Sequence, residues 1–213
     1  YADAQGYYAL YNGTVLRGGA RNVVMTETKG KSNYYALNFT WQKERGEDHF
    51  AWRMVYTLSL LENNTEDINF RAMDSNDFDA EWGPSVNDRR HLLNGLLYWY
   101  PHEKLSINLA ALIQSGQPVN RIPDGNVYGT TDLNGDGRSF GDAYLGNSDR
   151  EPGESRNSDR LPWSLTLDNS VFYTIQSGNR GKLELGMQVF NLLDAENWSG
   201  YANSATQSNQ IQA

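Results

Sequence analysis

The chain has 213 residues, of which 38% are hydrophobic and 21% charged, and its formal net charge is −8. No stretch approaches the roughly 18 unbroken apolar residues that a membrane-spanning helix needs, and a net negative chain without basic runs is not expected to bind nucleic acid. The absence of cysteine excludes disulfide frameworks, thiolate nucleophiles and cysteine-based zinc sites.

Alternation of apolar and polar residues predicts strands along most of the chain. The alternating runs are 32–42, 50–60, 105–114, 163–173 and 183–189. The first two runs are joined by a short charged connection that contains Gly46, which predicts a hairpin. The run 91–100 is also expected to be a strand, but both of its faces are mixed and its orientation stays open. No segment longer than a turn has a helical period, so the predicted fold class is all-β.

Short and long connections alternate between these strands. The short ones are 43–49, 101–104 and 177–181, and the long ones are 62–89, 115–161 and the polar stretch from residue 194. One end of the sheet therefore carries tight turns and the other carries large loops, as in transmembrane barrels with short periplasmic turns and long extracellular loops. Trp41, Phe50 and Trp99 lie beside the short turns, as in an interfacial aromatic girdle. The pattern predicts an antiparallel transmembrane β-barrel segment, with a β-sandwich as the alternative.

In a barrel, the two faces of each strand meet different surroundings. A polar face lines the aqueous lumen, because an arginine placed in lipid costs about 2–4 kcal/mol at the midplane. The residues predicted to face the lumen are Asn38, Thr40, Arg53, Asn108, Asp168 and Glu184. The residues predicted to face lipid are Leu37, Phe39, Trp41, Met54, Leu58, Ile107, Leu109, Leu165 and Leu185. A register shift of one residue would exchange the two sets.

Several short segments, taken in order, resemble one protein family. They are SNYYALNFTWQKERG, YTLSL, NDRRHLLNGLLYWYP, SGQPVN, DLNGDG, SRNSDRLPWSLTLDNSVFY and LELGMQVFNLLDAENW. Together they cover most of the chain from Ser32 onward and resemble the TonB-dependent outer-membrane receptors, in particular the Oar-like subgroup. The resemblance implies a barrel of about 22 strands with a plug in its lumen. Residues 1–213 would then be a carboxy-terminal part of that barrel, with about six strands and without the plug and the last strand.

The resemblance also implies a function and partners. The protein would lie in the bacterial outer membrane and take up a large substrate, with energy from a TonB-type coupling protein, and it would not be an enzyme. Its partners would be outer-membrane lipid, the remaining barrel and plug of the same receptor, and a surface lipoprotein. The alternatives are a small structural or adhesin-type outer-membrane barrel and a secreted β-sandwich that binds carbohydrate.

The long loops contain two sets of candidate binding residues. Asp132, Asn134 and Asp136 alternate before a glycine as in the first half of an EF-hand calcium loop, with Asp142 as a fourth candidate ligand. They predict a Ca²⁺ site that stiffens the loop, with a solvated turn as the alternative. Loop tips face the outside of a barrel. The predicted substrate contacts are therefore Trp82, Tyr128 and Tyr144.

Charged clusters flank several of the predicted strands. The residues 88–90 and 156–160 are predicted to form ion pairs at the lumen wall or rim, with ligand binding as the alternative. The repeated acidic residues of the loop 66–81, which include Glu66 and Glu81, are predicted to keep that loop hydrated. None of the three histidines has the spacing of a catalytic triad.

Overall fold

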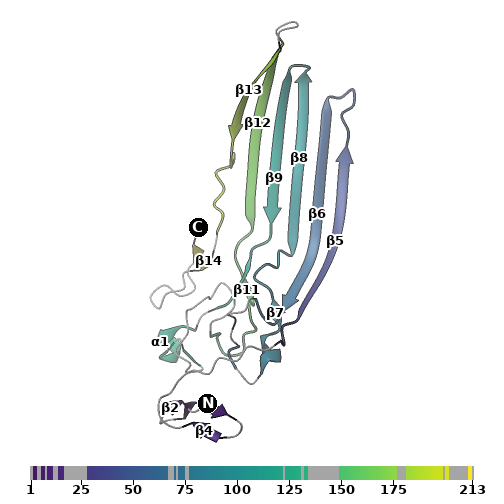
Figure 1. The fold of residues 1–213 in the computed structure, drawn as a ribbon. Coiled ribbons are helices and arrows are strands. Elements are labelled where there is room, and N and C mark those ends of the chain that lie inside the picture. Colours follow the sequence, from purple (N-terminus) through teal and green to yellow (C-terminus); the bar gives the residue numbers. More distant parts are fainter. Residues whose placement is uncertain are drawn as a thin grey trace.

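The structure is a computed structural model of residues 1–213. It describes residues 28–66, 70, 72–74, 77–121, 123–130, 132–133, 149–176 and 181–198, together with short strands near both ends. The short strands are β1 (Ala2–Asp3), β2 (Gly6–Tyr7), β3 (Ala9–Tyr11), β4 (Thr14–Leu16), β14 (Gly200–Tyr201) and β15 (Ile211–Gln212), which pair as three separate two-stranded sheets. The main feature of the described residues is one large antiparallel sheet (Figure 1).

Six long strands follow one another across this sheet in chain order. They are β5 (Ser32–Lys43), β6 (Phe50–Asn63), β8 (His91–His102), β9 (Leu105–Gln114), β12 (Ser164–Gln176) and β13 (Lys182–Val189). Every pair of neighbours is antiparallel. The predicted all-β class is therefore confirmed, and each predicted run corresponds to one strand.

Helical structure is minor in the described residues. It consists of η1 (Phe78–Glu81) and α1 (Gly125–Tyr128), each a single turn in a long loop. The side chains of Asp77 and Asp124 cap them by accepting backbone hydrogen bonds from Ala80 and Asn126. In this part of the chain, no helix has the length and hydrophobicity needed to cross a membrane.

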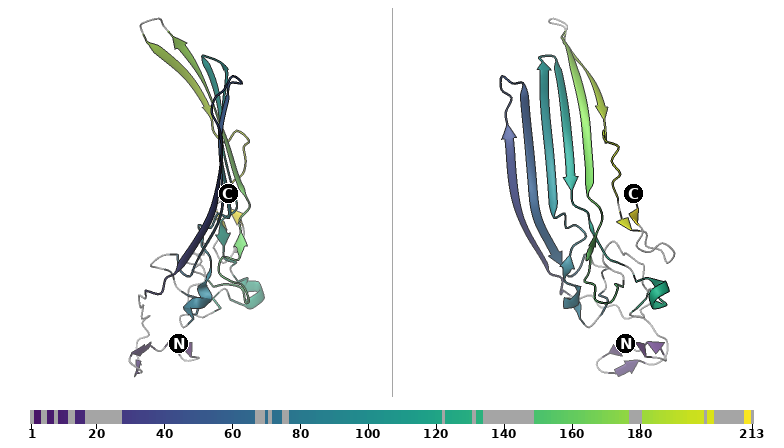
Figure 2. Two further views of the ribbon diagram at one scale, coloured as in Figure 1. Left: turned by 90° about the vertical axis from the view of Figure 1, so that its right-hand side faces the viewer. Right: turned by 180° about the vertical axis from the view of Figure 1, so that it is seen from behind.

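The sheet is a single curved and twisted layer, which Figure 2 shows edge-on and from behind. The turns 44–49 and 103–104 lie at one end of the sheet, together with the end of β12 and the start of β13, and the described parts of the long loops gather at the other end (Figures 1 and 2). In the first turn His49 adopts a positive φ of 63° and donates its N–H to the Gly46 carbonyl. Between Trp99 and His102 the register of β8 against β9 shifts, as in a β-bulge beside a turn.

The register divides the sheet into an apolar and a polar face, because residues paired across antiparallel strands project to the same side. Leu37 pairs with Leu58, and Leu109 pairs with both Leu97 and Asn169. All of the residues predicted to face lipid lie on the apolar face, and all of those predicted to face the lumen lie on the other face. β8, whose orientation the sequence left open, places Leu93, Leu97 and Trp99 on the apolar face.

The long loops form a compact base below the sheet. Here β7 (Gly83–Pro84) pairs with the end of β6, and β10 (Pro118–Val119) pairs with β11 (Asp159–Arg160). The close approach of the last two segments depends on Gly116, because a Cβ built there would lie 1.5 Å from the Leu161 carbonyl oxygen. The buried hydrophobic residues among those described are Ala72, Val86, Val119 and Leu161. All four lie in this loop base, outside the six long strands.

We predict that Gly116→Ala destabilises the loop base by about 3 kcal/mol or more, since the added methyl group meets backbone that cannot move aside. Gly95→Ala is the matched control, because its Cβ would lie 3.8 Å from the Ala111 methyl, in ordinary contact. Urea titration followed by tryptophan fluorescence measures both variants. Equal stability of the two variants would contradict the predicted role of Gly116.

Candidate functional site

The apolar face of the sheet is open to its surroundings in the described structure. Leu37 is 54% exposed, Trp41 72% and Met187 62%, although they are large apolar side chains in the middle or at the ends of long strands. The face spans five strand spacings of about 4.8 Å and about ten residues of 3.3 Å each, which is about 800 Å² in projection. The largest apolar patch on a soluble monomer is about 300–600 Å². This face is therefore larger than the apolar patches that soluble monomers usually expose.

Aromatic side chains gather at the turn end of the apolar face. Phe50 stacks on Trp99 with ring centroids 5.8 Å apart, and Trp41 meets Trp52 edge to face at 6.3 Å. The Arg45 guanidinium lies 4.3 Å from the centroid of the neighbouring Tyr100 ring. Trp41, Phe50 and Trp99, which the sequence placed beside the short turns, thus each contact another aromatic ring.

A second aromatic group lies at the loop end of the same face. His91 stacks on Trp163 at 5.4 Å and on Tyr56 at 6.2 Å, and the Tyr56 hydroxyl is hydrogen bonded to His91 Nδ1 at 2.8 Å. No sequence pattern predicts this group, because its members come from three separate strand regions. The apolar face is consequently bordered by aromatic rings at both ends.

The polar face carries a ladder of hydrogen-bonded side chains. Thr57 donates to the Asn38 amide oxygen at 2.7 Å, and Asn108 donates to the Ser170 hydroxyl at 3.2 Å. Asp168 accepts a hydrogen bond from the Asn191 backbone N–H at 2.8 Å. This face is less uniform than the other, because β8 and β12 also place Leu92, Leu96 and Phe172 on it.

Below the polar face, Arg156 is the centre of a buried network. Its guanidinium donates to the Glu66 carboxylate at 2.8 Å, to the Glu81 carbonyl at 2.7 Å and to the backbone carbonyl and side-chain oxygen of Asn63. The Arg156 and Glu66 side chains are 0% and 4% exposed. Burial lowers the pKa of Arg156, and the hydrogen bond to Glu66 opposes that lowering. Arg156 therefore holds together two loops that are far apart in sequence.

A second buried pair joins the same loops. Arg150 donates hydrogen bonds from both terminal guanidinium nitrogens to the Glu81 carboxylate, at 2.6 and 3.1 Å. Glu81 also accepts a hydrogen bond from the Met73 backbone N–H at 2.8 Å. This bidentate geometry is the strong form of an arginine–carboxylate contact. The prediction that the acidic loop residues stay hydrated is wrong for Glu66 and Glu81, because both compensate buried arginines.

Asp88 connects the network to the start of β8. Its carboxylate is fully buried, binds Arg160 and accepts the Leu61 backbone N–H at 2.9 Å, with the Arg90 guanidinium at 3.4 Å. The clusters 88–90 and 156–160, predicted as ion-pair groups, thus meet each other through Asp88 and Arg160. Arg89, by contrast, has no carboxylate partner among the described residues.

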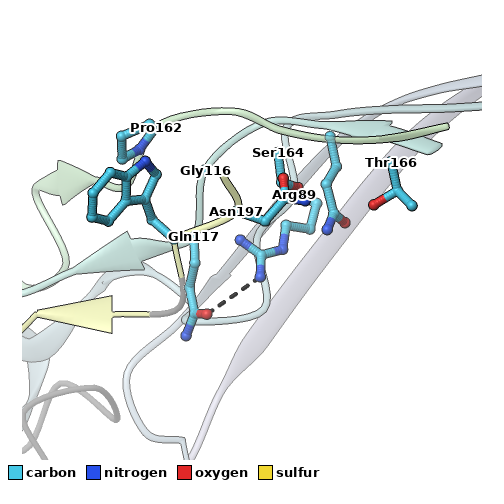
Figure 3. Close-up of a pocket in the computed structure, with 9 residues that line it drawn as sticks. Arg89, Gly116, Gln117, Pro162, Ser164, Thr166 and Asn197 are labelled. Carbon is cyan, nitrogen blue, oxygen red and sulfur yellow. Dashed lines mark hydrogen bonds between the residues drawn. The ribbon is translucent and has the colours of Figure 1, made fainter. Parts of the chain in front are cut away.

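A cavity of about 270 Å³ lies beside Arg89, on the polar side of the sheet where β9 and β12 approach the loops. In Figure 3, Arg89, Gln117, Ser164 and Thr166 surround this space, and Arg89 donates a hydrogen bond of 3.3 Å to the Gln117 amide oxygen. Burial lowers the pKa of Arg89, and the positive charge of Arg160 lowers it further. No sequence pattern predicts this cavity, because its wall combines four separate segments.

The predicted substrate and calcium residues are only partly within the described structure. Trp82 is half-buried at the end of η1, and Tyr128 is exposed in α1. Asp132 donates its N–H to the Thr130 hydroxyl at 3.1 Å. The other predicted positions, Asn134, Asp136, Asp142 and Tyr144, lie outside the described residues. Within the described part of the chain, no three acidic or histidine side chains are grouped to hold a metal ion.

Comparison of the chain with protein-family models, with curated proteins and with solved structures gave no match. The geometry of the two sheet faces and of the loop base therefore carries the functional argument.

We predict that Arg156→Leu destabilises the protein by about 3–5 kcal/mol, because removing one partner of a buried ion pair leaves Glu66 charged and unpaired. Arg121→Leu is the control, since Arg121 is half exposed and lies 3.9 Å from Glu151; such surface pairs contribute about 0–1 kcal/mol. Denaturant titration gives both values. A change of less than about 1 kcal/mol for Arg156→Leu would contradict the assigned role.

Proposed function

We propose that the six long strands are part of the wall of a transmembrane β-barrel in the bacterial outer membrane. The observation that carries this proposal is the continuous apolar face, which extends over all six strands and whose side chains are exposed or half-buried in the described structure. Its apolar run on β6, from Phe50 to Leu60, is about 33 Å long at the usual rise per residue. Tilted by about 40° as in barrels, that run is about 25 Å high, the height of the apolar band of an outer-membrane barrel.

Three further features support the barrel. Aromatic groups border the apolar face at both ends, as girdles do at the two membrane interfaces. Short turns lie at one end and long loops at the other, which corresponds to the periplasmic and extracellular sides. The outer strands β5 and β13 each have one edge without a partner among the described strands. In lipid such edges must pair with further strands, from the same polypeptide or from another chain.

We further propose that this barrel is a receptor of the TonB-dependent type, which takes up a large substrate with energy from a TonB-type coupling protein. The ordered segments that resemble the Oar-like subgroup support this assignment, and the polar face would line the lumen. Trp82, Tyr128 and Tyr144 are proposed as substrate contacts in the loops. Asp132, Asn134, Asp136 and Asp142 are proposed to bind a Ca²⁺ ion. A surface lipoprotein is proposed as a partner. The protein would act as a transporter, without covalent chemistry.

We predict that Leu37→Arg blocks barrel assembly, whereas Thr40→Arg on the opposite face of the same strand is tolerated. An arginine facing lipid costs about 2–4 kcal/mol at the midplane, while one in a hydrated lumen keeps its water. The measurement is the fraction of protein that reaches the outer membrane and shows heat-modifiable mobility on gels. Equal assembly of the two variants would contradict lipid contact by the apolar face.

We also predict that the protein sediments with outer membranes, needs detergent to dissolve, and belongs to a polypeptide several times heavier than 24.1 kDa. Membrane fractionation followed by intact mass measurement tests all three points. A membrane protein whose mass allows only about eight strands would instead indicate a small self-contained barrel. A protein that stays in solution without detergent would indicate the secreted β-sandwich.

A further inference from the structure

The cavity beside Arg89 has a positive charge that no carboxylate among the described residues pairs with. The neighbouring carboxylate, Asp88, is already used by Arg160, by Arg90 and by a backbone N–H. Arg89 makes one hydrogen bond from its side chain, to the neutral Gln117 amide, within the described structure. A half-buried guanidinium with five donors and a single neutral acceptor favours an anion, and a carboxylate fits its planar fork.

The wall of the cavity also offers neutral polar groups. Gln114, Ser164 and Thr166 line the space, and their side chains have no hydrogen-bond partner among the described residues. Hydroxyl and amide groups of this kind can donate to and accept from the hydroxyl groups of a ligand. The arrangement therefore offers one cationic contact and several neutral hydrogen bonds within one small volume.

The remaining wall is apolar and is held in place by backbone contacts. Trp198 and Pro162 line it, and Asn197 fixes the segment before Trp198 by exchanging two hydrogen bonds with the Leu165 backbone, at 2.8 and 3.1 Å. A tryptophan face beside polar groups can pack against the C–H face of a sugar ring. The volume of about 270 Å³ lies just below the lower limit of about 300 Å³ for pockets that hold drug-sized molecules, so a ligand of monosaccharide size fits.

We propose that this cavity is a binding site for a small hydroxylated carboxylate of the uronic-acid type. Arg89 binds the carboxylate, Gln114, Ser164 and Thr166 bind hydroxyl groups, and Trp198 covers the apolar side of the ring. The residues assigned to this site all lie within the described part of the chain, so a test of binding to them does not require barrel closure or transport.

Isothermal titration calorimetry of the intact protein with D-glucuronate tests the site. We expect saturable binding of glucuronate and at least about tenfold weaker binding of D-glucose, which has the hydroxyl groups without the charge. Acetate, which has the charge without the hydroxyl groups, is expected to bind at least about tenfold more weakly as well. Failure of glucuronate to bind to the folded protein, or equal binding of glucuronate and glucose, would overturn the proposal.

Substitutions locate the binding. Arg89→Gln is expected to lower glucuronate affinity about tenfold, to the level of glucose, whereas Arg121→Gln, at an exposed ion pair outside the cavity, leaves it unchanged. Thr166→Val removes a hydroxyl group at nearly constant shape. It is expected to lower the glucuronate affinity and to leave the buried ion pairs unchanged. Circular dichroism verifies folding of each variant. Unchanged affinity in both Arg89→Gln and Thr166→Val would overturn the assignment to this cavity, and membrane fractionation reports separately on the barrel.

Discussion

The exposed apolar face is the physical constraint on which the rest of this structure depends. Burying a large apolar side chain stabilises a protein by about 1.5–3 kcal/mol, and a domain's net stability is only about 5–15 kcal/mol. More than a dozen such side chains, including Phe39, Leu185 and Met187, are exposed in the described residues. If these side chains stayed in water, the burial free energy that the fold would lack would exceed the net stability of a typical domain. The proposed contact with a bilayer would supply the apolar surrounding that these side chains lack among the described residues.

The loop base differs from the sheet, because its interior contains buried charged side chains beside its four buried hydrophobic residues. Arg156, Arg150 and Asp88 are buried and paired where a soluble domain would place aliphatic side chains. Removing such charges from water costs several kcal/mol for each ion, so these pairs add little net stability. Their geometry instead fixes position, since Arg156 ties Asn63 to a segment 93 residues later. Loops held in this way can present a defined surface at one end of a sheet that no second layer covers among the described residues.

The sequence predicted what depends on local period, and it failed where contacts are distant. Strand positions and the two faces of β5, β6, β9 and β12 followed from alternation, because one side chain in two is apolar. The orientation of β8 did not, since Leu92 and Leu96 lie on the polar face opposite Thr57 and Arg53. The pairing of Glu81 with Arg150, 69 residues away, leaves no periodic signal at all. An acidic residue in a loop has the same appearance in sequence whether it is hydrated or buried.

The arginines of the loop base differ in whether a carboxylate pairs with them, and this difference distinguishes structural arginines from the one at the proposed binding site. The segments NDRRH, SGQPVN, SRNSDRLPWSLTLD and NLLDAENW, which carry much of the family resemblance, all contribute residues to the wall of the Arg89 cavity. Three of the arginines from these segments and the neighbouring loop are matched by carboxylates: Arg156 by Glu66, Arg150 by Glu81 and Arg160 by Asp88. Arg89 differs, because its only side-chain hydrogen bond within the described residues is to a neutral amide and it lines an open cavity. An arginine with a purely structural role would be paired with a carboxylate, as the other three are. Arg89 is therefore the arginine at which an external anion would complete the network.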